Sequence, residues 1–375
     1  MSTNVLDKAQ KSQSKNFLNY INTFRGLAIL LIIMGHTMQF GEQGSLTRVV
    51  NCEIVCGGTA LFIFISGFLF QHLSKKFEYK NYLSKKWSNV ILPYFFTSIP
   101  GLIFCFLFPI AYKNPFNDVN WLIQIPLHLS IGRVHNVPSW FIPMILIFFI
   151  FSYLFLKLEK KGWLYRLLPL FFLVTIFLQR GVMEYENTIG LAFFEKYLLY
   201  IKYILNGFLH FISLYTFGMY CSSKKEIIDV FWHKRNLLLA LMFLTAAVDV
   251  WLTYKNIYSN YTVSKTFATM ILLGSLKHFD VKIQQNQKLN LFFDTLAKYS
   301  FGLFFVHWYW LFVFNQLVPN LMLELNSVWG YVLSIIYVTV RFAIVTLFSY
   351  LSLKFIKFCV EKLKTNLSSR NVVGI

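Results

Sequence analysis

The sequence predicts an all-α integral membrane protein, a bundle of about ten transmembrane helices with both termini in the cytoplasm. Hydrophobic residues make up 57 % of the chain and charged residues only 14 %, whereas typical soluble domains carry about 25 % charged residues. The 42 Phe, 21 Tyr and 9 Trp supply more aromatic surface than a soluble core of this size needs. This composition excludes intrinsic disorder, a coiled coil and a small disulfide scaffold.

Ten apolar stretches approach the roughly 20 residues that a helix needs to cross a bilayer. The first lacks a small-x-small cleavage site, so we interpret it as an uncleaved helix rather than a signal peptide. The fifth and eighth stretches are the shortest, and the eighth contains Lys265. In chain order the predicted spans cover residues 17–40, 54–72, 90–112, 139–158, 164–179, 197–221, 236–254, 261–276, 297–318 and 328–353.

The distribution of Lys and Arg supports this count and sets the orientation. With the N-terminus inside, 25 of the 35 Lys and Arg residues fall on inner segments and inner span ends, and 8 fall on outer ones, while Arg25 and Arg341 lie within spans. Cytoplasmic loops of membrane proteins carry such an excess. The net charge of +19 therefore reflects membrane topology, and nucleic-acid binding is excluded. We expect a cytoplasmic tail at 1–16, a ten-helix membrane domain at 17–353 and a cytoplasmic tail at 354–375.

Charged and His side chains at membrane depth are costly, and they usually face the bundle interior and mark function. Arg25 and His36 share the first predicted helix. Their 11-residue separation puts them about 20° apart around the helix axis and about 16 Å apart along it, so they lie on one face. A guanidinium suits a phosphate or carboxylate, and an imidazole suits general acid–base catalysis. The alternative, an interfacial Arg25 and a His36 bonded to a neighbouring helix, stays open at this point.

Two more ionisable residues lie at depth, on the ninth and tenth predicted spans. His307 follows Lys298 by nine residues, about 13 Å of helix, and Arg341 lies near the middle of its span. A structural role is the alternative for each, but we expect both to face one interior cavity together with His36. His210, on the sixth predicted span, is interpreted as a packing residue.

Two further positions have both a packing and a functional interpretation. Ser66 and Gly67 interrupt an aromatic run on the second predicted span, where small residues let helices approach closely. Trp140 opens the fourth predicted span at the level of the membrane interface, where aromatic residues commonly form a belt. Trp faces also stack on sugar rings, so Trp140 is a candidate for an acceptor site as well.

Five motifs occur in the order and spacing of a known family. Together with the ten-span layout, they make nearly the whole chain resemble the membrane-bound acyltransferase family 3, of the type that O-acetylates surface polysaccharides. The motifs are Arg25-x(10)-His36, Phe64-Ile65-Ser66-Gly67-Phe68, Pro93-Tyr94, Ser139-Trp140-Phe141, and Ser300-Phe301-Gly302 followed by Val306-His307.

The resemblance implies an enzyme, a membrane-bound O-acyltransferase. Members of the family move an acyl group, usually acetyl from cytoplasmic acetyl-CoA, to hydroxyl groups of O-antigen, capsule or exopolysaccharide, or of their lipid-linked precursors. The chain is then expected to be a multi-pass protein of a bacterial inner or plasma membrane. Its partners are the bilayer, acyl-CoA as co-substrate and a carbohydrate acceptor, with no permanently bound cofactor.

The resemblance also assigns roles to residues. His36 and Arg25 become the catalytic pair, and Arg25, Lys85 and Lys86 become the acyl-CoA-binding residues. Members often carry a basic R-x-x-R before the third span, where this chain has Lys86 and the neutral Asn89. Lys lacks the bidentate fork of Arg, so the phosphate contacts of this loop are expected to differ. Supporting or acceptor-site roles fall to His307, Arg341, Ser66 and Trp140.

No metal site is expected, because the five cysteines include no CxxC pair and no Cys/His cluster has zinc-ligand spacing. The sequence leaves open whether the acyl group passes directly to the acceptor hydroxyl or through an acyl-His intermediate. The oligomeric state is open as well. The alternative function is a transporter or export component for polysaccharides or lipid-linked oligosaccharides, without acyl transfer.

Overall fold

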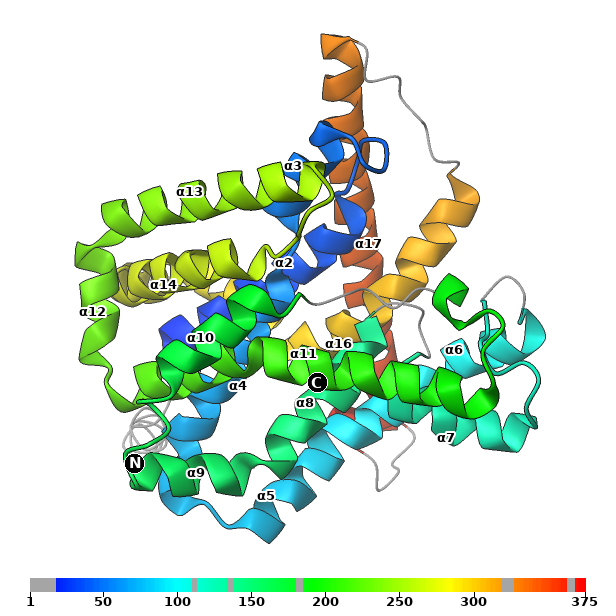
Figure 1. Ribbon diagram of the computed structural model, residues 1–375, viewed down its shortest axis with the longest axis horizontal. Coiled ribbons are helices and arrows are strands. Elements are labelled where there is room, and N and C mark those ends of the chain that lie inside the picture. Colours follow the sequence, from blue (N-terminus) through cyan, green and yellow to red (C-terminus); the bar gives the residue numbers. More distant parts are fainter. Residues whose placement is uncertain (1–17, 110–112, 134–137, 180–184, 319–326, 363–367) are drawn as a thin grey trace, which may run out of the picture.

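The computed structural model describes residues 18–109, 113–133, 138–179, 185–318, 327–362 and 368–375. Every regular element in this described part is a helix, which confirms the all-α fold class (Figure 1). Each predicted span contains a helix, and the predicted tail at 1–16 lies outside the described residues.

The helices follow the predicted spans in chain order, with short helices between them. The elements are α2 (Asn19–Thr37), α3 (Leu46–Val55), α4 (Gly58–Leu73), η1 (Ser74–Lys76), α5 (Tyr79–Lys86), η2 (Trp87–Ile91), α6 (Leu92–Leu107), α7 (Trp121–Ile131), η3 (Pro138–Trp140), α8 (Phe141–Ile150), α9 (Ser152–Lys160), α10 (Leu168–Phe177), η4 (Tyr185–Thr188), α11 (Phe193–Ser223), α12 (Glu226–His233), α13 (Arg235–Tyr254), α14 (Thr262–His278), α15 (Asp280–Gln285), α16 (Gln287–Leu317), α17 (Val328–Lys362) and α18 (Ser369–Val373).

Several of these helices are long and apolar enough to cross a membrane. The α8–α9 pair, which is bent by 45°, adds a sixth candidate if it forms one span. In contrast, α10 has only 10 residues, or about 15 Å of helix, half the thickness of a bilayer core. The count of ten crossings therefore stays a prediction. Within the described residues the five candidate spans are Leu46–Lys76, Tyr79–Leu107, Phe193–Ser223, Arg235–Tyr254 and Val328–Lys362.

The helices that carry the predicted site run in the same direction. Asn22 Nδ2 donates to Asp294 Oδ1 at 2.5 Å near the beginning of α2, and His36 contacts His307 near its end. Since the residue numbers of the contacting pairs increase together along both helices, α2 and α16 are parallel. The two helices are therefore oriented as the first and ninth crossings of the predicted bundle should be.

The last long helix runs back along α16. Tyr299 packs on Tyr350, and Phe314, further along α16, packs on Tyr337, nearer the start of α17. These pairs make α16 and α17 antiparallel, as consecutive crossings require. In Figure 1, α17 stands across the bundle and its first turns lie beside α3, where Thr47 Oγ1 and Tyr331 Oη are 3.1 Å apart.

A glycine divides the second predicted span. Gly57 adopts φ = +94°, in the left-handed region that favours glycine, and it separates α3 from α4. A Cβ atom at Gly57 would lie 2.6 Å from Cγ of Lys265. The ammonium group of Lys265, the charge within the eighth predicted span, reaches Glu53 with Nζ 3.6 Å from Oε1. The break thus lets a buried ion pair form beside the start of α4.

The small residues of the second span pack a helix crossing. A Cβ atom at Gly67 would lie 1.9 Å from the carbonyl oxygen of Tyr215, and one at Gly218 would lie 2.1 Å from that of Phe64. Only glycine fits at these two positions, because the backbones of α4 and α11 lie too close for a Cβ atom. Ser66, next to this contact, donates its hydroxyl to Phe62 O in its own helix at 2.8 Å. The close approach accounts for Gly67, and the Ser66 hydroxyl is used within its own helix.

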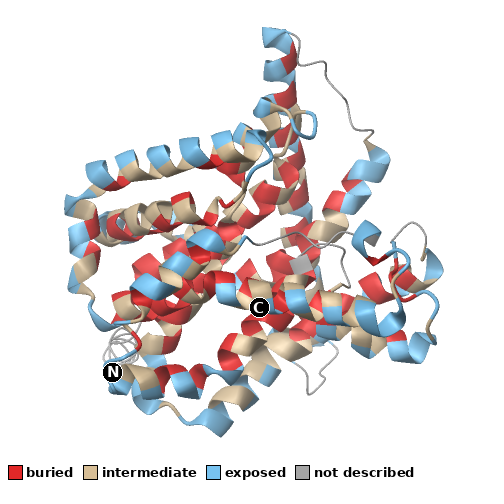
Figure 2. Ribbon diagram, in the orientation of Figure 1, coloured by how far each residue is buried: buried red, intermediate tan, exposed pale blue. Residues whose placement is uncertain are grey.

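Burial divides the helices into inner and outer ones. In Figure 2, α2, α4 and α11 are rich in buried residues, whereas α13 is largely exposed. Only Leu238 and Asp249 of α13 are buried, although the helix is among the candidate spans. An apolar but exposed helix is the pattern of a lipid-facing segment.

The chain stays helical beyond residue 353, where the last predicted span ends. The helix α17 continues to Lys362, and the short helix α18 packs against α6, α17 and η2. Val373 of α18 is buried. Its carbonyl oxygen packs so closely on Gly302 that a Cβ atom there would lie 2.8 Å from it. The described part of the predicted 354–375 tail is thus part of the helical bundle.

Candidate active site

The helix α2 presents both of its ionisable side chains to α16. Arg25 Nη2 donates to Ser300 Oγ at 3.1 Å. Further along, the His36 ring stacks on the His307 ring, with centroids 5.3 Å apart and planes inclined by 30°. Arg25 and His36 therefore lie on one face, as their spacing predicts.

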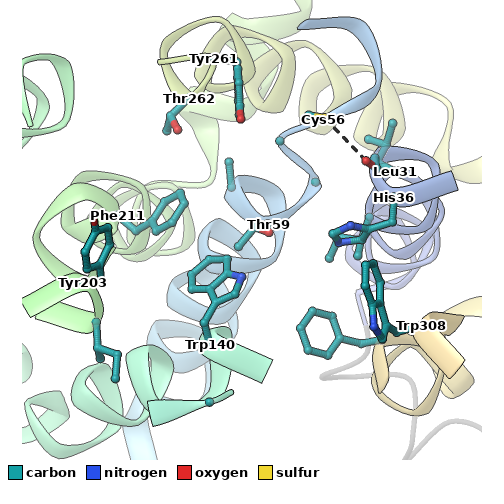
Figure 3. A pocket seen from close by; sticks show the side chains of 18 of the residues that line it. Leu31, His36, Cys56, Thr59, Trp140, Tyr203, Phe211, Tyr261, Thr262 and Trp308 are labelled. Atoms are coloured by element: carbon teal, nitrogen blue, oxygen red, sulfur yellow. Dashed lines mark hydrogen bonds between the residues drawn. The ribbon is translucent and has the colours of Figure 1, made fainter. Parts of the chain in front are cut away.

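His36 opens into a cavity of about 430 Å³ between α2, α4, α11, α14 and α16. Figure 3 shows its ring pointing into this cavity, with Trp308 beside it and Trp140 across from it. Trp308 packs edge-on against His36, with ring centroids 5.5 Å apart. The imidazole is therefore held between two rings of α16 and still borders open space.

The cavity has aromatic walls with a few polar groups. Among the described lining residues there is no Asp or Glu, and no three His, Cys, Asp or Glu side chains of the described chain lie close enough to hold a metal ion. Flat aromatic surfaces interrupted by hydrogen-bonding groups suit a carbohydrate ring. The aromatic lining is Trp140, Tyr200, Tyr203, Phe211, Tyr261, Phe304 and Trp308, and the polar lining is His36, Gln39, Cys56, Thr59, Arg133 and Thr262.

His307 lies behind His36 and is fully buried. Its Nδ1 is 2.8 Å from Leu303 O, and because a carbonyl oxygen only accepts, Nδ1 carries the proton. Nε2 is then an unprotonated acceptor in the neutral ring, and it is buried without a hydrogen-bond partner among the described residues. His307 does not line the cavity, so it reaches bound molecules only through His36.

Arg341 holds the end of α2 rather than facing the cavity. Its Nε donates to Thr37 O at 2.6 Å and its Nη2 donates to Gln39 O at 3.0 Å. These carbonyls belong to the C-terminal end of α2, which lacks helical donors and attracts positive charge. Thr37 directly follows His36, so Arg341 fixes the backbone that carries the imidazole. Of the two residues expected beside His36, His307 contacts its ring and Arg341 acts through the helix end.

Gln39 and Cys56 also line the cavity, although neither belongs to a motif in the sequence. Gln39 Nε2 donates to Gly35 O and lies 3.2 Å from Cys56 Sγ, and its Oε1 accepts from Arg48. These contacts connect the loop after α2 to the end of α3. Gln39 follows His36 by only three residues and lies just beyond the end of α2, and this closeness in sequence is the signal that could have identified it.

Arg133 supplies a positive charge at the rim of the cavity. Its guanidinium lies 5.9 Å from the centre of the Tyr200 ring, which also lines the cavity. Burial and, secondarily, Arg133 lower the pKa of nearby His128 to about 4, so His128 is neutral at physiological pH. The rim is therefore positive because of Arg133 and not because of His128.

The predicted donor-binding residues lie apart from this cavity. Arg25 does not line it, and the Lys86 ammonium lies 4.3 Å from the centre of the Phe149 ring and 5.1 Å from that of Tyr82. Lys85 is exposed. The charge of Arg25 acts on Lys86, so these two cations belong to one region of the molecule.

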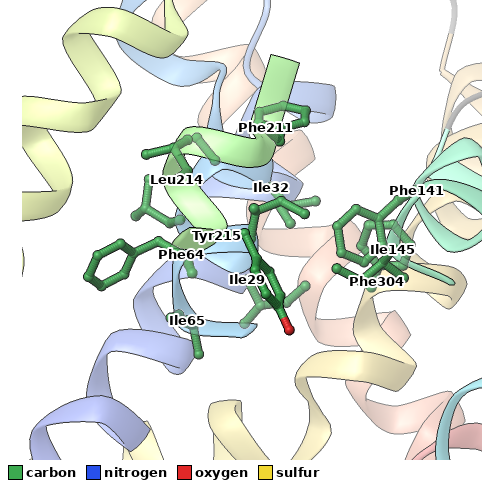
Figure 4. Close-up of a cluster of buried hydrophobic side chains, with 14 of the residues drawn as sticks. Ile29, Ile32, Phe64, Ile65, Phe141, Ile145, Phe211, Leu214, Tyr215 and Phe304 are labelled. Carbon is green, nitrogen blue, oxygen red and sulfur yellow. The ribbon is translucent and has the colours of Figure 1, made fainter. Parts of the chain in front are cut away.

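A packed apolar layer lies along α2 between Arg25 and His36. Ile29 is fully buried and Ile32 nearly so. Figure 4 shows both within the cluster that includes Tyr215 and Phe304. The structure thus brings Arg25 and His36 to one face of α2 without joining them through one open cavity.

His210 has the packing role assigned to it. Its Nδ1 lies 2.8 Å from Leu178 O and its Nε2 lies 2.8 Å from Thr262 Oγ1. The side chain is 1 % exposed, so both ring nitrogens are used within the fold. His210 thereby joins α11 to the end of α10 and the beginning of α14.

The chain was matched to known proteins at the level of the family. No curated protein and no solved structure matched it. The family model for an acyltransferase domain matches residues 18–351, a range that begins just before α2 and ends within α17 and so contains the whole site. A match over so much of the sequence establishes membership, and the chain belongs to the acyltransferase family 3.

Proposed function

We propose that this chain transfers an acyl group, most directly acetyl from acetyl-CoA, to a hydroxyl of a cell-surface polysaccharide or of its lipid-linked precursor. The observation that carries the proposal is the position of His36. Its imidazole borders an aromatic-walled cavity and shares a helix face with Arg25. Family membership supports the acyl transfer, while donor and acceptor are inferred from the chemistry of the two ends of this face.

The proposed reaction uses His36 as general base. The imidazole takes the proton of the acceptor hydroxyl while the oxygen attacks the thioester carbonyl. The C–O bond forms, the C–S bond breaks, and the imidazolium returns the proton to the leaving thiolate. In the alternative route His36 attacks the thioester first, and the acyl group passes from the ring to the hydroxyl. In both routes an ester and free CoA are the products.

The acceptor is proposed to bind in the cavity. Trp308 beside His36 and Trp140 across the cavity from it offer faces on which sugar rings stack, and Arg133 offers a charged donor at the rim. No carboxylate lines the cavity among the described residues, so neutral or anionic sugars are both accommodated. The indole rings then orient a hydroxyl toward the imidazole.

The donor is proposed to approach from the opposite end of α2. Arg25 and Lys86 provide positive charge for the phosphates of acyl-CoA, and the thin pantetheine arm extends toward His36. Ile29 and Ile32 fill this route, so donor binding requires their side chains and the facing residues of α16 to move. We infer that the packed layer opens only when donor is bound, which limits loss of acyl-CoA to water.

The proposed topology gives the two substrates separate sides. With both termini in the cytoplasm, Arg25 and Lys86 lie toward the inner face of the bacterial plasma membrane and His36 lies toward the outer face. The parallel course of α2 and α16 and the antiparallel course of α17 support alternating crossings, and the excess of Lys and Arg on one set of segments supports the cytoplasmic side. Acetyl-CoA made in the cytoplasm then serves an acceptor on the other side.

The test is mass spectrometry of surface glycans from host cells with the gene, without it, and with the gene restored. O-acetyl groups that disappear on deletion and return on restoration are the expected result. In parallel, purified protein in lipid nanodiscs should release CoA from acetyl-CoA when glycan acceptor is added. Unchanged acylation after deletion, together with altered glycan export, would instead favour a transporter.

A further inference from the structure

The helix α18 is fixed onto the same end of the bundle as Arg25. Gly374, which ends it with φ = +73°, lies against the Phe301 ring, where a Cβ atom would approach Cδ1 to 2.3 Å. The carbonyl oxygen of Val373 packs against Gly302, where a Cβ atom would lie 2.8 Å from it. Ser300, the preceding residue of this motif, accepts the hydrogen bond of Arg25. One short segment of α16 thus contacts both Arg25 and α18.

This arrangement concentrates positive charge. Arg370 of α18 is exposed, and its charge acts on both Arg25 and Lys86, while Arg25 also acts on Lys86. Within the described residues no carboxylate is among the charges acting on Arg25 or Lys86. Three cations from three separate segments therefore repel one another without an acidic partner.

The contribution of η2 is uncharged. Its sequence, Trp87 to Ile91, contains no Lys or Arg, and Asn89 lies at its centre. The helix α18 packs directly against η2 and α6. A cation carried by α18 can therefore reach an anion held at Lys86, whereas η2 itself contributes no cation.

We propose that Arg370 completes a phosphate-binding site with Arg25 and Lys86, and that its ligand is the phosphate end of the acyl-CoA donor. This inference rests on the proposed function. Two guanidinium groups and one ammonium offer the forked and point-charge donors that phosphates bind. A multiply charged anion would also remove the repulsion among the cations. The headgroup of an anionic phospholipid has the same chemistry and is the competing source of phosphate.

The experiment uses the full chain in phosphatidylcholine nanodiscs and measures binding of CoA and of pantetheine, which has no phosphate, by calorimetry. Arg370→Ala should weaken CoA binding about tenfold or more, the effect of losing a charged hydrogen bond, and should leave pantetheine binding unchanged. Arg370→Lys should recover part of the loss. The matched control is Lys362→Ala, which removes one positive charge from the end of α17.

Each outcome decides between the alternatives. If wild-type protein fails to bind CoA, the donor assignment and this inference both fall. If wild-type protein binds CoA and Arg370→Ala binds it equally well, the inference about Arg370 is overturned while the proposed function stands. Nanodiscs containing phosphatidylglycerol provide the second arm. If Arg370→Ala loses bound phosphatidylglycerol, measured by native mass spectrometry, but keeps its CoA affinity, the site is one for lipid headgroups.

Discussion

The His36 ring stacks on the ring of His307, with 5.3 Å between centroids. The hydrogen bond from His307 Nδ1 to Leu303 O fixes one tautomer and leaves the second nitrogen as a buried acceptor. The two histidines therefore have different roles. His36 borders the cavity and can exchange protons with bound molecules, whereas His307 supports His36 from behind.

Replacing His36 by Ala should reduce acyl transfer by at least about 10²–10⁴-fold, the usual contribution of a general base. The protein should fold normally, because His36 is only partly buried. The measurement is CoA release by purified protein with glycan acceptor. The control is His233→Ala, which removes an exposed histidine far along the chain in α12. Wild-type activity in well-folded His36→Ala protein would remove the catalytic role.

Replacing His307 by Ala should lower kcat about tenfold while KM for acetyl-CoA stays constant. The stacked ring positions His36, and the loss of one positioning contact of about 1.4 kcal/mol corresponds to a factor of ten. A matched control is His278→Ala, since His278 also stacks on a ring, that of Trp232 at 4.1 Å. An unchanged kcat in His307→Ala would restrict His307 to packing.

The sequence predicts the helices better than it predicts the contacts between them. Apolar length predicts where helices form, since each of the predicted spans contains a helix. It does not reveal that α10 ends after 10 residues or that α8 and α9 meet at 45°. Helix length and bending depend on neighbouring helices, which the periodicity of one segment does not encode.

The site shows the same division. The 11-residue spacing predicts that Arg25 and His36 share a face, because both lie on one regular helix. It cannot predict that Arg341 bonds to Thr37 O or that α18 brings Arg370 to Arg25, since these contacts join segments about 300 residues apart or more. A buried charge in a span predicts only that a partner exists.

Replacing Arg25 by Ala should weaken acetyl-CoA binding about 10–100-fold, because a charged hydrogen bond to phosphate contributes about 1.5–3 kcal/mol. Arg25→Lys should recover only part of the affinity, since the fork is lost. Dissociation constants measured in nanodiscs test this. Ser300→Ala is the control, because it removes the partner of Arg25 and keeps the cation. Unchanged affinity in Arg25→Ala would move the donor site elsewhere.

Replacing Arg341 by Ala should lower both thermal stability and kcat. It leaves Thr37 O and Gln39 O without their donor, and each unsatisfied buried group costs about 1–3 kcal/mol. Thermal unfolding in detergent and steady-state kinetics provide the two readouts. Arg235→Ala is the control, since Arg235 also donates to a carbonyl, Trp232 O, at 3.1 Å. A variant as stable as wild-type protein would show that the end of α2 does not need Arg341.

Reporter fusions should reveal alternating sides along the chain. The excess of Lys and Arg on one set of segments predicts which side is cytoplasmic. Alkaline phosphatase is active only outside, and green fluorescent protein is fluorescent only inside, so paired fusions give complementary signals. Inside signals are expected at Lys76, Lys160, Lys225 and Lys288, and outside signals are expected at Gly44, Asn117, Glu184, Asn256 and Asn320.

The fusion at Glu184 tests the shortest crossing. Tyr165, just before α10, contacts Ser223 at 2.8 Å between hydroxyl oxygens, and Thr175, near the end of α10, contacts Ser213 at 2.6 Å. These contacts make α10 antiparallel to α11, as a crossing requires. Only Leu168 and Thr175 of α10 are buried, so the rest of its apolar surface is free to face lipid. The antiparallel course beside α11 is that of a crossing, so we expect Glu184 outside. A cytoplasmic signal at Glu184 would make α10 a re-entrant helix, reverse the expected side of the following segments and reduce the number of crossings.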